Sequence, residues 1–290
     1  MSAMTLTEFF RDFYKPLRLR GRSANTVRLY GNTVKQFDKF LGRPSTLDDL
    51  CDLTMSRYLD HRCAMRSVFT AEKERSQLFA MWRCAADRRM IEFRPTLQVT
   101  QMPTRIPTAW SLDQLRQLVA TAKVAKGNIG DVPARIFWPA LILVLWQCAE
   151  RIGAVMSCTK ADYVRPRLLV RAEYRKGGKR DKLYTFTDSV CDLLDVLAAT
   201  GPSEHLFYWP KNREYMWSLF GKLIQQSGIP SQKKARFHQL RRSAATFFTA
   251  SGGDAVALLD HSNPKTTKAY LDPRFIDSGP KPCDVLPDIG

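Results

Sequence analysis

The sequence lacks the cysteine pattern of a disulfide-bonded or zinc-binding protein. Its seven cysteines stand at positions 51, 63, 84, 148, 158, 191 and 283, and no two of them form a Cys-x-x-Cys pair. An odd and irregularly spaced set argues against a disulfide framework and against a structural zinc site. We therefore interpret all seven as small apolar residues in a reducing compartment, and we expect a cytoplasmic protein that holds no metal.

Long apolar runs are missing as well. The longest, from Ile136 to Trp146, reaches about half of the roughly 20 residues that a membrane-spanning helix requires, and it contains Pro139. The first ten residues lack the basic and then apolar pattern of a secretory signal peptide. We therefore expect no membrane partner.

Acidic residues are scarce relative to basic ones. The 290 residues include 45 Lys and Arg but only 28 Asp and Glu, which gives a formal net charge of +17. Residues 1–100 hold 18 basic and 11 acidic residues, a balance of +7, which leaves +10 for the remainder. A charge spread in this way favours a polyanionic partner, and double-stranded DNA is the first candidate. The alternative is a solvated basic surface.

The apolar pattern and the prolines predict two domains. Residues 1–98 should be helical, with helices at 5–14, 47–62 and 71–90 and one along residues 27–40, where apolar side chains recur every three or four positions. Prolines at 95, 103 and 107 favour an extended connector, so we place a linker at 99–110. Residues 111–290 form the second domain, with an irregular tail from about residue 277.

The second domain should combine helices with one β-hairpin. Two strand-like runs, 168–175 and 182–186, flank Lys176-Gly177-Gly178-Lys179, and such a Gly-Gly pair is typical of a tight turn. The expected fold class is therefore α+β, mostly helical with a small hairpin or sheet. Helices are predicted at 134–158, 188–199, 212–227 and 236–251, and two short ones around His261 and Tyr270.

Six polar side chains could together act on a phosphodiester. Two guanidiniums can hold phosphate oxygens and stay charged, a lysine and histidines can move protons, and a phenol can attack phosphorus. Taken singly, each has a structural alternative, such as an arginine paired with Glu150, a solvated basic turn or a packed tyrosine. The six residues are Arg151, Lys176, His238, Arg241, His261 and Tyr270.

The order of these six residues resembles the tyrosine recombinase (phage integrase) family. Residues 237–242 read Phe-His-Gln-Leu-Arg-Arg, and residues 258–262 read Leu-Leu-Asp-His-Ser. Thr-Thr follows at 266–267 and Tyr-Leu-Asp-Pro at 270–273. The resemblance covers the two-domain layout, and it implies a helical core DNA-binding domain at 1–98 and a catalytic domain at 111–290.

The resemblance implies a DNA strand-exchange reaction. Tyr270 would attack the phosphorus, form a 3′-phosphotyrosyl bond and release a 5′-hydroxyl, while Arg151 and Arg241 hold the non-bridging oxygens. Because the phosphodiester energy is kept in the covalent bond, rejoining needs neither ATP nor any other cofactor. Four protomers would assemble on two duplexes, and accessory proteins are not specified by the sequence.

The resemblance also implies three proton or hydrogen-bond roles. Lys176 would protonate the leaving 5′-oxygen, His238 would assist proton transfer at the tyrosine, and His261 would donate a hydrogen bond to the phosphate. The sequence departs from the family at Ala154, where an acidic residue is frequent, and at Asp260, where glycine is common. Arg242 replaces a frequent histidine.

Two other functions fit the same residues. A type IB topoisomerase shares the covalent chemistry but relaxes supercoils as a monomer, and a non-catalytic DNA-binding protein would have no need of Tyr270. The separate basic helical domain favours site-specific recombination, as integrases of mobile elements carry out. Further side chains expected to contact DNA are Arg22, Arg28, Lys35, Arg83, Lys179 and Arg180.

Overall fold

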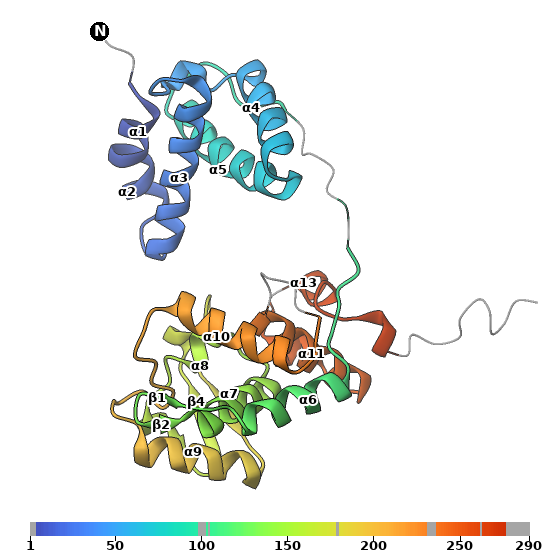
Figure 1. Ribbon diagram of the computed structural model, residues 1–290. Coiled ribbons are helices and arrows are strands. Elements are labelled where there is room, and N and C mark those ends of the chain that lie inside the picture. The colour runs from blue at the N-terminus through green and yellow to red at the C-terminus, as the bar shows by residue number, and fades with distance from the viewer. Residues whose placement is uncertain are drawn as a thin grey trace, which may run out of the picture. The chain divides into compact units, whose positions relative to one another are not determined.

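The chain folds into two compact units, residues 1–104 and 105–290 (Figure 1). The computed structural model describes residues 4–97, 103, 105–177, 180–230, 236–261 and 263–276. The division between the units falls inside the predicted linker at 99–110. The predicted tail from about residue 277 lies outside the described residues. Each unit has its own buried apolar core.

The regular elements of unit 1 are helices within the described residues. Three short segments follow one another directly: α1 (Leu6–Phe9), a π-helical turn (Phe10–Tyr14) and α2 (Lys15–Arg18). The helix predicted at 5–14 therefore continues to Arg18. The other elements are α3 (Ala24–Leu41), a 3-10 turn (Leu47–Asp49), α4 (Asp52–Met65) and α5 (Val68–Asp87).

The predicted apolar stripe of α3 faces the core of unit 1. Val34 and Phe37 are buried there, and the other members of the stripe pack against the same cluster. Ser23 begins the helix, because its side chain accepts a hydrogen bond from the backbone of Thr26. Gly42 ends the helix with a φ of 70°, a left-handed conformation that favours glycine.

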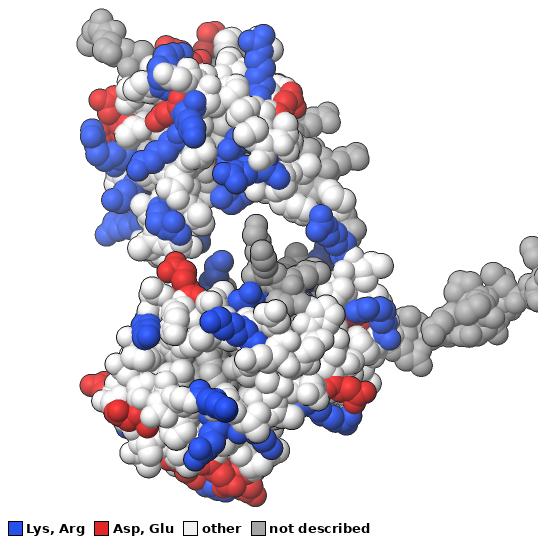
Figure 2. All heavy atoms as spheres, in the orientation of Figure 1, with Lys and Arg blue, Asp and Glu red and all other residues white. Residues whose placement is uncertain are grey.

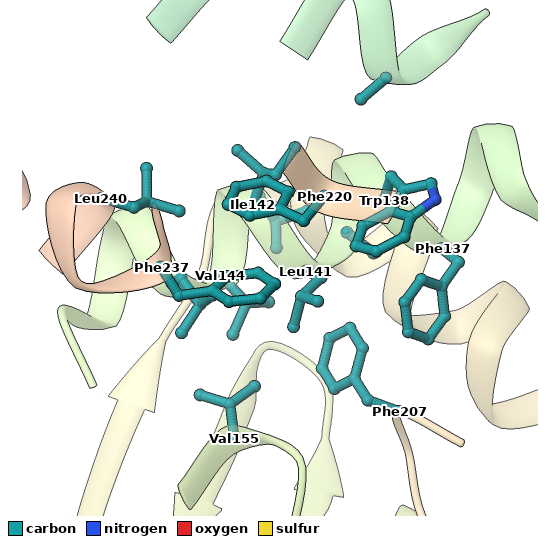
Figure 3. Close-up of a cluster of buried hydrophobic side chains, with 14 of the residues drawn as sticks. Phe137, Trp138, Leu141, Ile142, Val144, Val155, Phe207, Phe220, Phe237 and Leu240 are labelled. Carbon is teal, nitrogen blue, oxygen red and sulfur yellow. The ribbon is translucent and has the colours of Figure 1, made fainter. Parts of the chain in front are cut away.

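In unit 2 a central apolar helix, α7 (Ala134–Cys148), is surrounded by three others. It packs against α6 (Leu112–Lys123), α9 (Asp188–Thr200) and α11 (Arg236–Ala250). Figure 3 shows Trp138, Leu141 and Val144 of α7 among side chains from α10 (Arg213–Gln226) and α11. Phe220 of α10 stacks on Trp138 of α7 and on Phe237 at the start of α11, so stacked rings position the start of α11, where two predicted site residues lie.

The helix predicted at 134–158 is wrong beyond Cys148. Ala149 has a φ of 50° and ends α7, and a short helix, α8 (Ile152–Val155), follows after Arg151. The break exposes backbone carbonyls at the end of α7 that need partners. Arg241 donates one of its hydrogen bonds to the carbonyl of Ala149, so a distant side chain stabilises the break.

The predicted tight hairpin is also wrong in detail. Three antiparallel strands form the sheet in the order β3 (Tyr163–Val164), β4 (Arg167–Val170) and β5 (Lys182–Thr185), with Leu168 opposite Tyr184. The strand predicted to reach residue 175 stops at Val170, and a 3-10 turn (Ala172–Tyr174) follows. A loop of residues 171–181 therefore joins β4 to β5. Within this segment, of which residues 178 and 179 are not described, Arg175 is buried in an ion pair with Glu150.

The remaining elements of unit 2 are short. A two-stranded ribbon, β1 (Asn128–Ile129) and β2 (Val132–Pro133), was not expected from the sequence. The two short helices predicted around His261 and Tyr270 are α12 (Ala255–Leu259) and α13 (Pro264–Lys268), so neither residue is itself helical. The 3-10 turns are Lys160–Asp162 and Pro273–Phe275.

Basic side chains lie over the surface of each unit in the view of Figure 2. Among the described residues, no helix is long and apolar enough to cross a bilayer. Of the cysteines, which we interpret as small apolar residues, Cys51 is exposed, Cys63 is half-buried, and four are buried: Cys84, Cys148, Cys158 and Cys191. Cys283 lies outside the described residues.

Candidate active site

The two predicted arginines line one pocket. Arg151 follows the break after α7, Arg241 lies on α11, and both border a cavity of about 240 Å³ together with His238, Trp217 and Arg236, among others. A water molecule occupies about 30 Å³ of liquid, so the cavity has room for a phosphate group. Both guanidiniums can therefore approach a single anion.

Arg241 is held rigidly, with only 2% of its surface exposed. Its two terminal nitrogens donate to the carbonyl of Ala149 and, at 3.0 Å, to the carbonyl of Leu259. These carbonyls lie at the C-terminal ends of α7 and α12. Its Nε is buried and has no hydrogen-bond partner among the described residues. A buried donor without a partner is costly, and a bound phosphate oxygen would satisfy it.

Tyr270 is surrounded by cationic and imidazole groups. Its ring lies 4.9 Å from the His238 ring and 5.0 Å from the His261 ring, measured between centroids, and both contacts are edge-on. The guanidinium carbons of Arg241 and Arg242 lie 5.8 and 5.9 Å from the Tyr270 ring centroid. The structure therefore brings five of the six predicted residues together, and it adds Arg242, which we had noted only as a departure from the family.

The segment that carries Tyr270 is fastened at both sides. On its N-terminal side, the backbone N–H of Tyr270 donates to the Thr267 carbonyl at 2.8 Å. On its C-terminal side, the fully buried Asp272 accepts from the backbone N–H of Ala109 at 2.7 Å and from Arg274 at 2.6 Å. The ring is thus fixed by contacts that the spacing of the motif does not reveal.

Thr267 also orients His261. The Nδ1 atom of His261 lies 3.0 Å from the hydroxyl oxygen of Thr267, which is itself buried. The Nε2 atom of His261 is buried without a partner among the described residues. If the threonine hydroxyl donates to Nδ1, then Nε2 carries the proton and can donate to an anion. The Thr-Thr motif therefore has a structural explanation.

The site lowers the pKa of both histidines. Burial, followed by the charges of Arg242, Arg241 and Arg151, lowers the pKa of His238 to about 4. Burial and then Arg241 also lower the pKa of His261. His238 is consequently neutral at pH 7 and able to accept a proton. An arriving phosphate anion would offset the arginine charges and raise this pKa again.

Glu150 is the buried counter-ion of the site. Its carboxylate accepts from Arg175 Nε at 2.6 Å and from the Tyr184 hydroxyl at 2.8 Å, and it lies 3.7 Å from Arg241 Nη1. The alternative of a simple Arg151–Glu150 side-chain pair is therefore wrong, since only the backbone N–H of Arg151 donates to Glu150. A glutamate at the end of the most apolar helix was the available signal for this role.

The sixth predicted residue, Lys176, makes no contact with the other five among the described residues. It is exposed in the loop between β4 and β5, directly after the buried Arg175. Lys179 lies outside the described residues. Arg180, on the other side of the loop, is exposed and lies 3.5 Å from Asp260. The loop is joined to the site through Arg175, which pairs with Glu150, and in the described part of the chain no contact fixes the Lys176 amine.

The candidate DNA contacts of unit 1 are on the surface. All four are exposed, and Arg28 donates to Asn25 at 2.8 Å. Because these side chains are exposed in the folded protein, they stay solvated until DNA arrives and can reach its phosphate backbone. The four residues are Arg22, Arg28, Lys35 and Arg83.

Metal ligands do not gather in the part of the chain that the structure describes. There, no group of three or more His, Cys, Asp or Glu side chains could hold a metal ion. The positive charge at the site comes from arginines.

Sequence comparison finds relatives over nearly the whole chain. Residues 110–275 match the model of the phage integrase family. The tyrosine recombinase XerD of Halalkalibacterium halodurans is 21% identical over 272 residues, which cover 87% of this chain and 88% of that protein. The tyrosine recombinase XerA of Thermococcus kodakarensis is 23% identical over 283 residues, which cover 91% and 90%.

Comparison with solved structures shows a shared fold. A lambda integrase tetramer bound to a Holliday junction matches with a TM-score of 0.75 at 17% identity, over 94% of this chain and 79% of that one. The Tn1549 transposon integrase in complex with circular intermediate DNA matches with a TM-score of 0.71 at 16% identity, over 93% and 95%. Both matches extend beyond unit 2, since they cover more residues than that unit contains.

Proposed function

The chain belongs to the phage integrase family, and we propose that it is a site-specific recombinase that cuts and rejoins double-stranded DNA through Tyr270. One observation carries the proposal: Tyr270 lies among two imidazoles and two guanidiniums beside an arginine-lined pocket. Relatives along most of its length are named tyrosine recombinases. The basic surface of both units suits a DNA partner.

The first step is attack on phosphorus. The phenolic oxygen of Tyr270 forms a bond to the phosphorus while the bond from phosphorus to the 5′-oxygen breaks, and a 3′-phosphotyrosyl link results. Arg151 and Arg241 stabilise the added negative charge on the non-bridging oxygens, and the buried Nε of Arg241 offers a donor for one of them. His261 supplies another donor through Nε2.

Two protons move during this step. The phenolic proton passes to His238, whose low pKa leaves the ring neutral and ready to accept it. The departing 5′-oxygen receives a proton from Lys176. Rejoining is the same reaction in reverse, with a 5′-hydroxyl attacking the phosphotyrosine, so the breaking and rejoining steps need no external energy source.

The assembly and the place of action follow from the same proposal. Exchange between two duplexes requires four strand cleavages, and we infer a tetramer of this chain on DNA, as a structural neighbour forms on a Holliday junction. We infer that the protein acts in the cytoplasm, where it would be associated with the nucleoid when it is bound to DNA. The named relatives, which are tyrosine recombinases, do not favour the alternative of a type IB topoisomerase, which would relax plasmids without regard to sequence.

Covalent capture on DNA tests the proposal. The substrate is a pool of nicked duplexes with a randomised segment, from which the wild-type protein selects its own sites as adducts that survive denaturing electrophoresis. We expect wild type to form adducts, Tyr270→Phe to bind the selected DNA without forming any, and Tyr215→Phe, at an exposed tyrosine of α10, to match wild type. An adduct that persists in Tyr270→Phe would refute the nucleophile, and recovery of no sequence preference would favour the topoisomerase.

A further inference from the structure

One carboxylate holds both ends of the loop that carries Lys176. Asp260 Oδ2 lies 2.9 Å from Arg175 Nη1, and Asp260 Oδ1 lies 3.5 Å from Arg180 Nη2. Arg175 and Arg180 border the segment 176–179. The same Arg175 nitrogen donates to the carbonyl of Arg180 at 3.1 Å, which closes the base of the loop further.

Asp260 occupies an unusual backbone conformation. It ends α12 with a φ of 54°, in the left-handed region where residues other than glycine are uncommon and where Asp and Asn are tolerated best. Many family members carry glycine at this position, as noted for the sequence. An aspartate here keeps a backbone that suits glycine and adds a negative charge that meets two arginines.

The rest of the loop base is tied to the same helix end. Lys182 Nζ donates to the carbonyls of Ala257 at 2.6 Å and Leu258 at 2.9 Å, at the C-terminus of α12. Arg175 Nε bonds to Glu150 at 2.6 Å in the buried interior of unit 2. These contacts hold the base of a loop in which Lys176 is exposed.

We propose that Asp260 is a positioning residue that sets where the loop presents Lys176. The next residue after Asp260 is His261. One short segment therefore carries both a hydrogen-bond donor to the phosphate and the carboxylate that holds the base of the loop with Lys176. This inference rests on the proposed function, in which Lys176 gives its proton to the 5′-oxygen as the phosphorus–oxygen bond breaks. Without the Asp260 charge, the lysine would be presented to that oxygen in only a fraction of the molecules.

We call the contacts of Asp260 with Arg175 and Arg180 the clamp. Limited proteolysis tests the clamp without any DNA. Trypsin cuts after lysine and arginine, so cutting within 176–180, mapped by mass spectrometry, reports how often the loop opens. Asp260→Asn keeps the side-chain size and tolerates the left-handed backbone but removes the charge. We expect cutting to rise on the order of tenfold, as the loss of a charge-assisted hydrogen bond would give. An unchanged rate would overturn the clamp.

A matched control lies on the same helix. Asp254 caps the other end of α12, where it accepts from the backbone of Val256 and Ala257. Asp254→Asn makes the same change of charge and keeps a good helix cap. We expect it to leave cutting of the loop unchanged. Asp260→Gly, which removes the carboxylate and suits the backbone, should open the loop while the protein melts no earlier than wild type.

A sulfur substitution in the DNA tests the consequence for Lys176. The selected nicked duplex is made with its bridging 5′-oxygen replaced by sulfur, because a thiolate leaves without needing a proton. We expect Asp260→Asn and Lys176→Ala to form adducts slowly on ordinary DNA and at nearly the wild-type rate on the sulfur substrate. A general acid contributes about 10²–10⁴-fold, so partial misplacement should cost on the order of tenfold.

The outcomes separate this inference from the function beneath it. If Lys176→Ala is rescued by sulfur but Asp260→Asn is as fast as wild type on ordinary DNA, or stays slow on both, the positioning role is refuted alone. If sulfur does not rescue Lys176→Ala, the acid role of Lys176 fails and the positioning role fails with it. If wild type forms no adduct at all, the proposed function fails, and the trypsin result then decides the clamp alone.

Discussion

Removing the charge of Glu150 should destabilise unit 2 more than any other single charge change in the site. The Glu150 side chain is 1% exposed and the Arg175 side chain 3%, so neither is solvated when the other is lost. Arg241, at 2% exposure, faces the same carboxylate from 3.7 Å. Glu150→Gln keeps the size and can still accept from Tyr184, but it leaves the buried Arg241 without its anion and leaves Arg175 with Asp260 as its one remaining carboxylate among the described residues.

The magnitude follows from this burial. Loss of one member of a buried ion pair costs about 3–5 kcal/mol, because the remaining charge is left in a poorly solvated site. The retained amide oxygen favours the lower end, about 3 kcal/mol. For a domain of 150–250 residues, each kcal/mol shifts the melting temperature by about 2–4 °C. We therefore expect unit 2 to melt about 6–12 °C earlier in Glu150→Gln.

Thermal unfolding, followed by calorimetry, measures this shift. Glu173→Gln provides the control, because Glu173 is an exposed carboxylate close to Arg175 in the chain, and it should change the melting temperature by no more than 1–2 °C, about the size of an ordinary surface effect. Sulfate should restore part of the loss in Glu150→Gln, since an anion bound only to the folded state stabilises it. A melting temperature within about 2 °C of wild type would refute the role of Glu150 as counter-ion.

Two further predictions concern protons and salt. The pKa of His238 is lowered to about 4, so the unfolded chain, with an ordinary histidine pKa of about 6.5, takes up a proton first as the pH falls. The free energy of unfolding should therefore fall by about 3 kcal/mol between pH 6.5 and pH 4. Denaturant titrations should show a smaller fall in His238→Asn, and an equal fall in this variant would contradict the lowered pKa of His238. In unit 1, Arg28→Gln and Lys35→Gln should each reduce the salt dependence of DNA binding by about one released ion, whereas Arg165→Gln, which removes an arginine paired with α9 carboxylates, should not. Equal slopes for all three variants would exclude these DNA contacts.

The helices of this chain could be predicted because their signals are local. The apolar stripe along residues 27–40 and the runs at 188–199, 212–227 and 236–251 gave helices whose bounds agree with α3, α9, α10 and α11 within a few residues. The motif around His238 and Arg241 lies on a single helix, so its spacing predicts that both side chains share one face. Periodicity reports contacts over one or two turns, and these elements depend on little else.

The errors arose where distant residues decide the local backbone. Ala149 adopts a left-handed conformation, which is usually predicted from a glycine, and the sequence has an alanine there. Its carbonyl accepts a hydrogen bond from Arg241, 92 positions away. The strand predicted to reach residue 175 gives way to a turn because Arg175 pairs with Glu150, 25 positions earlier, and with Asp260, 85 positions later. Apolar patterning carries no information about such ion pairs, so the buried network of the site could not be predicted.

The position of its acidic groups distinguishes this site from the family pattern noted in the sequence. Ala154 is buried where an acidic residue is frequent. Without a nearby carboxylate, the positive charges of the arginines would repel one another in the folded chain. Glu150 supplies that missing charge from one residue before Arg151, and Asp260 supplies a second where glycine is common. Both carboxylates contact Arg175, so Arg175 joins the end of α7 to the segment that begins at His261. The Arg241 Nε and His261 Nε2 atoms nevertheless remain without partners among the described residues. The acidic groups therefore offset the charge of the arginines without occupying these two atoms, which stay available to bind an anion.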